Sequence, residues 1–400
     1  MAESQQALKQ FQQEVRSWMQ ENVPEDPGFL LPLSFLEVGT EQQLDFLREW
    51  QHRLWSAGFL GMHWPTELGG QGAEPVYQGI VDRELARANA PIIFNTIGLN
   101  WVGPLLLDIG SAEAQQRYVK RILSAEDIWC QGFSEPDHGS DLGSVQTRAV
   151  RDGDDYVVNG SKIWTTMGNY ADHMILLART APQGERKYDG LSFFLSPMKI
   201  GGVEAHPIRK VTGEYGFNQV FFTDARISAD TMVGTEGQGW GVAMKTLEYE
   251  RGVSSGQASG HFIVATGVDD MVNELRDFVR DGAPLFDDPL VADEAVRLLI
   301  EAKGLALTQK RMAIPGLGND YPMGIALSSK LRGTEFSRRL KLFTASMQGA
   351  LGALYMGDDD AHRGGFWQRA YFSNFGTTIG GGTSEIQANI VGEHVLGLPK

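Results

Sequence analysis

The chain has 400 residues, of which 42% are hydrophobic and 21% charged, a composition typical of a globular protein with two or three domains. The formal net charge of −15 disfavours nucleic acids and anionic membranes as partners, because both require a basic surface. No apolar run approaches the roughly 18 to 20 residues of a membrane helix, and the N-terminus lacks the pattern of a secretory or transit peptide. We therefore expect a cytoplasmic protein. The single cysteine, Cys130, excludes an internal disulfide, and no Cys/His spacing indicates a metal site.

The spacing of apolar residues changes twice along the chain. Residues 1–125 show a helical period, for example from Val76 to Ala88. Residues 126–235 favour an antiparallel β barrel or sandwich, with Asn159-Gly160 predicting the type I′ turn of a hairpin. Its expected strands are Tyr156 to Val158, Lys162 to Thr166, His173 to Arg179, Leu191 to Leu195 and Val220 to Thr223. From 236 to 400 the helical period returns, which indicates a third, helical domain.

The segment between Cys130 and Thr166 has the features of a cofactor site. A loop rich in Gly, Ser and Asp contains Gly139 and Ser140, which can offer backbone N–H groups to a diphosphate. Side chains alternate along a strand, so we expect Trp164 and Thr166 on one face. The indole can stack on a planar ring, and the hydroxyl can bond a ring nitrogen. The alternative is a buried tryptophan beside an ordinary turn.

A helix expected from about Trp240 carries a candidate general base. Glu250 shares a helical face with Ala243 and Leu247, and a carboxylate on an apolar face suits proton abstraction. A buried ion pair is the alternative role. Glu248 lies three residues before Arg251, a spacing that suits a pair facing solvent or a ligand.

Glycines mark two further stretches of the chain. Those at positions 252, 256 and 260 cost a helix about 1 kcal/mol each, and they permit close approach by a slender ligand or another helix. Near the C-terminus, Gly380 to Gly382 precede an S-x-x-Q capping box formed by Ser384 and Gln387. Backbone N–H groups before a helix suit a developing oxyanion, although a plain entry loop would have the same sequence.

In this order, the motifs of the chain resemble those of the acyl-CoA dehydrogenase family, and the resemblance covers nearly the whole chain. The matching segments are Trp64-Pro65 with Gly69-Gly70, Ser134-Glu135-Pro136 with Gly139-Ser140-Asp141, Asn159-Gly160 with Lys162, Trp164 and Thr166, Val220 to Arg226, Gly237 to Trp240, and Gly382-Thr383-Ser384-Glu385-Ile386-Gln387.

The resemblance implies an α+β fold with a helical N-terminal domain (1–125), an antiparallel β middle domain (126–235) and a C-terminal four-helix bundle (236–400). It also implies noncovalently bound FAD. The residues expected to bind FAD are Phe133, Ser134, Gly139, Ser140, Trp164, Thr166, Thr383 and Glu385. Those expected to touch the acyl-CoA are Ser140, Glu248 and Arg251.

Two departures from the family pattern affect the predicted mechanism and assembly. Gly381 stands where many members have the catalytic base, whereas Glu250-Arg251 matches the members that place the base on the bundle helix. Glu250 is therefore the expected base, and the Gly381 N–H the expected donor to the thioester carbonyl, together with the FAD ribityl hydroxyl. The family's R-x-F-G motif cannot be placed around Met271 to Gly282. The chain is similar in this to the catalytic member of an α2β2 pair, while a homo-oligomer stays open.

The function implied by this resemblance is α,β-dehydrogenation of an acyl-CoA to the trans-2-enoyl-CoA, with an electron-transfer flavoprotein as electron acceptor. The alternatives are a flavin-dependent monooxygenase on the same fold and a non-catalytic subunit that completes a partner's flavin site. Straight, branched, steroid and aromatic acyl groups all remain open, as does a carrier-protein thioester.

Overall fold

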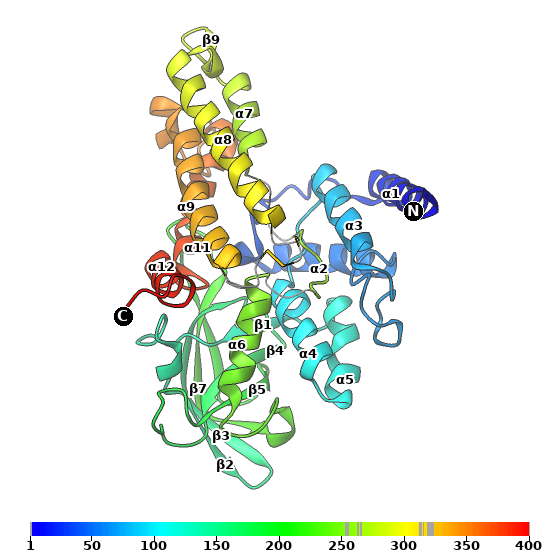
Figure 1. The fold of residues 1–400 in the computed structure, drawn as a ribbon, viewed down its shortest axis with the longest axis vertical. Helices are drawn as coiled ribbons and strands as arrows, with labels where there is room; N and C mark the ends of the chain where they lie inside the picture. The colour runs from blue at the N-terminus through cyan, green and yellow to red at the C-terminus, as the bar shows by residue number, and fades with distance from the viewer. Residues whose placement is uncertain are drawn as a thin grey trace. The chain divides into compact units, whose positions relative to one another are not determined.

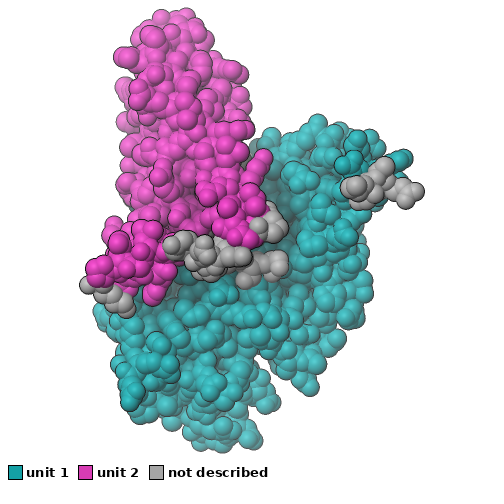
Figure 2. Space-filling view, viewed as in Figure 1, with its two compact units in different colours: residues 1–264 teal, residues 265–400 magenta. Residues whose placement is uncertain are grey.

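The structure is a computed structural model that describes residues 2–252, 256–261, 264, 266–311, 314, 316–317 and 324–399. The chain folds as two compact units, residues 1–264 and 265–400 (Figure 2). The predicted domain boundaries near residues 125 and 235 stay a prediction. None of the described helices is long and apolar enough to cross a membrane.

The first part of unit 1 is helical, as predicted. Its elements are α1 (Ala2–Asn22), η1 (Phe35–Glu37), α2 (Glu41–Ser56), η2 (Thr66–Leu68), α3 (Pro75–Arg87), the π-helical turn η3 (Gly98–Val102), α4 (Gly103–Ile109) and α5 (Ala112–Leu123). Apolar side chains at helical spacing face one core, where Val15, Leu54 and Leu105 are fully buried. Thr40 and Gln43 form a capping box that fixes the start of α2.

A mixed sheet follows in the same unit (Figure 1). The described strands of this seven-stranded sheet run in the order β1-β4-β2-β3-β7-β6, with β5 paired to β4. They are β1 (Trp129–Gly132), β2 (Arg148–Asp152), β3 (Asp155–Thr166), β4 (His173–Arg179), β5 (Leu191–Pro197), β6 (Val203–Ile208) and β7 (Phe217–Ser228), with turns η4 (Leu142–Ser144) and η5 (Ala229–Thr231). Most pairs are antiparallel, but β4 pairs in parallel with β1 and, at one position, with β2.

The hairpin predicted at Asn159-Gly160 is wrong. Strand β3 runs straight through these residues, and the hairpin turn lies instead at Gly153-Asp154, between β2 and β3. The amide of Asn159 exchanges hydrogen bonds with Asp224, where the β3–β7 register shifts. Gly160 has φ +144°, and a Cβ there would lie 2.7 Å from Thr147 Oγ1. The Asn-Gly pair thus serves a bulge and a close backbone approach, which local turn preference cannot distinguish from a hairpin.

Helix α6 (Gly239–Glu250) packs on the sheet and ends at the predicted base. Its core-facing residues Ala243 and Thr246 have no exposed surface. The glycine-rich stretch that follows does not continue the helix in its described residues 256–261, and residues 253–255 lie outside the described part. The amide of Asn100 pairs with the backbone of Ser259, so this stretch is tied to η3.

Unit 2 is helical and has its own core. Its elements are α7 (Val268–Asp277), the β8 (Val279–Arg280) and β9 (Ala283–Pro284) hairpin, η6 (Leu285–Asp287), α8 (Pro289–Arg311), α9 (Gly324–Ser346), η7 (Gly349–Ala353), η8 (His362–Gly365), α10 (Phe366–Ser373), α11 (Phe375–Ile379), α12 (Ser384–Ile390) and the π-helical η9 (Val391–Val395). Figure 1 shows α7, α8 and α9 packed side by side. Met271, Leu298 and Trp367 are buried between the helices of this unit.

Candidate active site

The loop that follows β1 is fixed to β3 by a buried ion pair. Lys162 Nζ lies 2.9 Å from Glu135 Oε1 and also donates to the Phe133 carbonyl at 3.0 Å. Glu135 in addition accepts the backbone N–H groups of Gln146 and Thr147, at 2.6 and 2.8 Å. These contacts hold the Phe133–Ser134 backbone beside β3, where the Ile163 N–H donates to the Ser134 carbonyl at 2.9 Å.

Burial and charge act in opposite directions on this pair. Burial alone would raise the pKa of Glu135, but the Lys162 ammonium and the two amide donors outweigh burial and hold that pKa below its ordinary value. Lys162 has no exposed surface, and burial lowers the pKa of its ammonium although Glu135 opposes the change. The ion pair exists because each partner satisfies the other inside the protein.

Trp164 lies on a bulge of β3. Lys162 pairs with Val220 and Thr165 with Asn218, so Ile163 and Trp164 together face one residue of β7. Trp164 has φ +60°, and 56% of its surface is exposed, whereas Thr166 is 6% exposed. The strict alternation that predicted a shared face for the two residues therefore breaks at Trp164. The Phe217 ring contacts the indole edge to face, with centroids 6.0 Å apart.

The rest of the predicted flavin loop is open to solvent. Gly139 and Ser140 are exposed, and a Cβ on Gly139 would meet no atom within 4 Å. Asp141 pairs with Lys187. Behind the loop, the buried guanidinium of Arg179 donates to the carbonyls of Gly143, Val145, Lys187 and Asp189. Arg179 thus holds the backbone of the loop through hydrogen bonds to its carbonyls.

Glu250 lies at the end of α6 against β1. Gln131 Nε2 on β1 donates to Glu250 Oε2 at 3.5 Å, and the Glu250 side chain is half-buried. Leu247, one turn earlier, packs against the core, which agrees with the face predicted for Glu250. Gln131 precedes Ser134 by three residues, about 10 Å of extended chain. Strand β1 thus contacts the Glu250 carboxylate through Gln131 and leads into the loop whose Ser134 carbonyl accepts from Ile163 of β3.

The two predicted substrate contacts near Glu250 differ in environment. Glu248 is exposed, and Arg251 is the half-buried C-cap residue of α6. Within the part of the chain that the structure describes, Arg251 Nε is buried without a hydrogen-bond partner. A buried guanidinium nitrogen is normally paired, so this one is an exception among the described residues. The suggested Glu248–Arg251 pair is absent from the ion pairs of the described residues.

The glycine turn before α12 lies in unit 2. Gly381 and Gly382 have φ +65° and +89°, in the left-handed region that glycine tolerates best. Gln387 Nε2 donates to the Gly381 carbonyl at 2.8 Å, and Lys330 Nζ to the Gly382 carbonyl at 2.6 Å. Both carbonyls are thus engaged within the unit, while the described backbone offers the Gly381 N–H no acceptor.

The predicted capping box of the last helix is wrong. Thr383 is the N-cap of α12, and its hydroxyl accepts from the Ile386 N–H at 3.2 Å. Ser384 is the first helical residue and donates to Glu335, while Gln387 reaches Gly381 instead of the cap. Glu385 lies in the first turn, where its own backbone N–H and the Thr383 hydroxyl lower the pKa of its carboxyl.

Comparison with known proteins identifies the class of this chain. It matches the acyl-CoA dehydrogenase N-terminal domain over residues 5–126, the middle domain over 130–225 and the C-terminal domain over 237–396. The chain therefore belongs to the acyl-CoA dehydrogenase family, flavoprotein oxidoreductases that act on CH–CH bonds and use FAD. The resemblance drawn from the motifs and the α+β fold class are thereby confirmed.

Individual relatives match most or nearly all of the chain. Acyl-CoA dehydrogenase IpdE1 of Mycobacterium tuberculosis is 37% identical over 401 residues, covering 99% of both chains. The human mitochondrial short-chain specific acyl-CoA dehydrogenase is 30% identical and covers 85% of this chain and 80% of its own. Among solved structures, the Tcur3481-Tcur3483 steroid ACAD has a TM-score of 0.82 at 30% identity, covering 98% of both chains.

The residues present fit the FAD that the family uses. An exposed indole on a bulge of β3 offers a face to a planar ring, and an open Gly-Ser loop offers N–H groups to a diphosphate. The structure brings Phe133, Ser134 and Trp164 together in unit 1, whereas Thr383 and Glu385 lie in unit 2.

Sequence reasoning missed the role of four supporting residues. The Glu135–Lys162 partnership, Arg179 and Gln131 were not recognised as parts of the site. For Lys162 a signal existed. A lysine between β-forming residues of a strand is expected to be buried, and a buried ammonium needs an acidic partner. No local pattern points to Gln131 or Arg179, since their partners are distant carbonyls and a side chain on another element.

Proposed function

We propose that this enzyme catalyses α,β-dehydrogenation of an acyl-CoA thioester to the trans-2-enoyl-CoA, with Glu250 as the base. The observation that carries the proposal is the contact between Glu250 and Gln131. This contact places the Glu250 carboxylate against β1. Strand β1 leads directly into the Phe133–Ser134 loop, which lies beside the strand that carries Trp164. The proposed base is thus linked through β1 to the loop that carries the predicted flavin contacts.

Each residue has a defined part in the proposed reaction. Glu250 accepts the α-proton, and the Gly381 N–H donates to the thioester carbonyl, which stabilises the enolate and makes the α-carbon more acidic. Trp164 and Thr166 orient the flavin ring, and Ser140 and Arg251 hold the CoA thioester, with Glu248 at the exposed end. Bound FAD supplies the acceptor for the hydride that leaves the β-carbon.

For the acyl group we propose a bulky, ring-containing substrate of the steroid type. Two observations support this choice. A similar solved structure, 30% identical, is a steroid ACAD, and Gly381 places no side chain where many family members have their base. A smaller residue at that position leaves more room around the β-carbon.

For the assembly we propose a pair with a second acyl-CoA dehydrogenase-like subunit, in α2β2 form, with an electron-transfer flavoprotein as electron acceptor. The similar solved structures include the ChsE4-ChsE5 complex from Mycobacterium tuberculosis, which is 27% identical with a TM-score of 0.76. The R-x-F-G motif that cannot be placed in this chain is consistent with a partner that completes the flavin site. Size-exclusion chromatography with and without the co-expressed partner distinguishes this pair from a homo-oligomer.

The test of the reaction is an anaerobic titration of the FAD-loaded protein with a panel of acyl-CoAs, followed by the flavin absorbance band. We expect steroid-type acyl-CoAs to bleach the band and straight short chains to leave it. Bleaching by short chains alone would overturn the substrate class. An unbleached band with every thioester, on protein that retains FAD, would overturn dehydrogenation and favour the monooxygenase. A colourless protein that gains FAD only with its partner would show that the flavin site is shared.

A further inference from the structure

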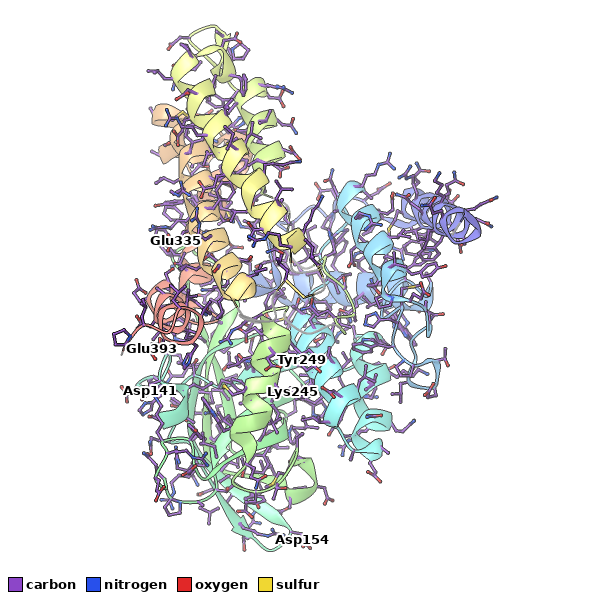
Figure 3. All side chains as sticks on the ribbon, in the orientation of Figure 1. Asp141, Asp154, Lys245, Tyr249, Glu335 and Glu393 are labelled. Atoms are coloured by element: carbon purple, nitrogen blue, oxygen red, sulfur yellow. The ribbon has the colours of Figure 1, made fainter. Side chains whose placement is uncertain are left out.

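The residue before Glu250 ties α6 to a neighbouring helix. Tyr249 is 5% exposed, and its hydroxyl donates to Asp108 Oδ2 on α4 at 2.7 Å. Lys245, one turn earlier on α6, places its Nζ 2.6 Å from the same oxygen. Figure 3 shows Lys245 and Tyr249 on α6, where the helix passes α4. One carboxylate oxygen thus receives two donors from successive turns of α6.

Charge and burial both favour this contact. The donors from Lys245 and Tyr249 lower the pKa of the Asp108 carboxyl, so it stays ionised. Burial is the main cause that raises the pKa of the Tyr249 phenol, and the hydrogen bond to Asp108 raises it further, so the phenol stays a donor. The negative charge of the exposed Glu248 also raises the pKa of the Tyr249 phenol, by a smaller amount.

The backbone of Tyr249 is held as well. Its carbonyl accepts the Gly252 N–H at 3.0 Å and Gln257 Nε2 at 3.2 Å. Glu250 is the last residue of α6, and the last turn of a helix normally frays. A base on such a turn keeps its position only if the turn is anchored from outside the helix.

We propose that Tyr249, Asp108 and Lys245 form an anchor that positions Glu250 for proton abstraction. They are positioning residues, because none of them reaches Glu250 through its own side chain in the contacts described. The proposal rests on the proposed role of Glu250 as the base. A reacting carboxylate displaced by about 1 Å loses much of its rate, so the anchor acts on the chemical step more than on binding.

The test isolates proton abstraction from hydride transfer. The probe is a 3-thia-acyl-CoA, whose sulfur replaces the β-carbon, so it can lose an α-proton but no hydride. In deuterium oxide Glu250 takes the α-proton, exchanges it with solvent and returns a deuteron to the carbon. Mass spectrometry of the recovered thioester gives the exchange rate on the FAD-loaded protein, and steady-state assays give kcat and KM.

We expect Tyr249→Phe and Asp108→Ala each to slow exchange and kcat about tenfold, with KM within about twofold and FAD content unchanged. Asp108→Asn keeps an oxygen that accepts the Tyr249 hydroxyl, so it should recover most of the exchange rate. Tyr118→Phe is the matched control, a buried tyrosine of α5 in the same core, and should exchange as the wild type does.

Exchange at the wild-type rate in both Tyr249→Phe and Asp108→Ala would overturn the anchor. So would an Asp108→Asn variant as slow as Asp108→Ala. If Tyr249→Phe fails to fold, the two Asp108 variants decide, since that side chain is 41% exposed. Glu250→Gln separates this proposal from the proposed function. If Glu250→Gln still exchanges the α-proton, Glu250 is not the base. If Glu250→Gln loses exchange but the Tyr249 and Asp108 variants keep it, Glu250 stays the base and only the anchor is overturned.

Discussion

Lys162 and Glu135 form an ion pair inside the sheet unit, with 2.9 Å between Nζ and Oε1 and with 0% and 7% of the two side chains exposed. The pair joins the loop after β1 to the bulged strand β3. Ser134, which precedes Glu135, and Trp164, two residues after Lys162, are proposed flavin contacts. The pair therefore links the stability of the unit to the shape of its cofactor surface.

Lys162→Met should destabilise unit 1 by about 3–5 kcal/mol, because it leaves the Glu135 carboxylate buried without its counter-ion. It should also lower the FAD content, since the Phe133–Ser134 backbone loses a donor. Urea unfolding and flavin absorbance measure the two effects. The control is Lys187→Met, which removes the exposed pair with Asp141 and should cost under about 1 kcal/mol. Equal losses in the two variants would contradict this account of the buried pair.

Trp164→Ala should weaken FAD binding about tenfold while changing the stability of the apoprotein little. The indole is 56% exposed, so the apoprotein gains little from it, whereas a stacked flavin would bury it. The control is Phe221→Ala on β7, an aromatic residue 38% exposed, which should leave FAD affinity unchanged. Titration of each apoprotein with FAD provides the measurement. A Trp164 variant with wild-type affinity would remove the indole from the flavin site.

Gly382→Ala should destabilise unit 2 by about 1–2 kcal/mol, because its φ of +89° disfavours any L-residue. The new Cβ would also lie 2.7 Å from Gln387 Nε2, which holds the Gly381 carbonyl. We therefore expect kcat to fall with the displaced Gly381 N–H. Gly376→Ala is the control, in α11 with no atom within 4 Å of its Cβ. A Gly382 variant with unchanged stability and kcat would show that the turn is not needed.

Glu84 should contribute to stability above acidic pH only. Arg16 holds the pKa of this buried carboxyl at about 2, below its ordinary value of 4.5, through hydrogen bonds of 2.8 and 2.9 Å. Because the folded pKa is depressed, the contribution is complete above about pH 4.5 and is lost as the pH falls towards 2.

Glu84→Gln should therefore cost about 2 kcal/mol near pH 7 and progressively less below pH 4.5. Glu126→Gln, which removes a carboxylate 50% exposed in its pair with Arg121, should cost little at any pH. Unfolding curves at pH 7, 4 and 3 provide the comparison. A cost for Glu84→Gln that is constant over this range would contradict the depressed pKa.

The fold could be predicted because motifs and periodicity agree along the chain. The strand expected from His173 to Arg179 occurs with those ends, and α3 lies within one residue of its predicted bounds. These segments are set by local pattern and burial. Asn159-Gly160 failed because its partners are Asp224 and Thr147, which only the assembled sheet brings near.

For the candidate site, the roles predicted for individual residues stay predictions, and the sequence did not reveal the contacts that support them. Trp164 was recognised, yet its bulge depends on the register with β7 and cannot be read from alternation. Ser384 has the sequence of a helix cap, but Thr383 occupies that position, and its hydroxyl accepts from the Ile386 N–H. Tyr249 and Asp108 lie 141 residues apart, so their contact required the fold.

The most direct test of the central claim is the rate of flavin reduction in Glu250→Gln, measured by anaerobic stopped flow with the acyl-CoA that bleaches the wild type. The variant should fold, retain FAD and bind the thioester, because glutamine keeps the shape of the side chain. Its reduction rate should fall at least about 1,000-fold, since the amide cannot accept the α-proton. Reduction at a rate near that of the wild type would contradict the assignment of Glu250 as the base.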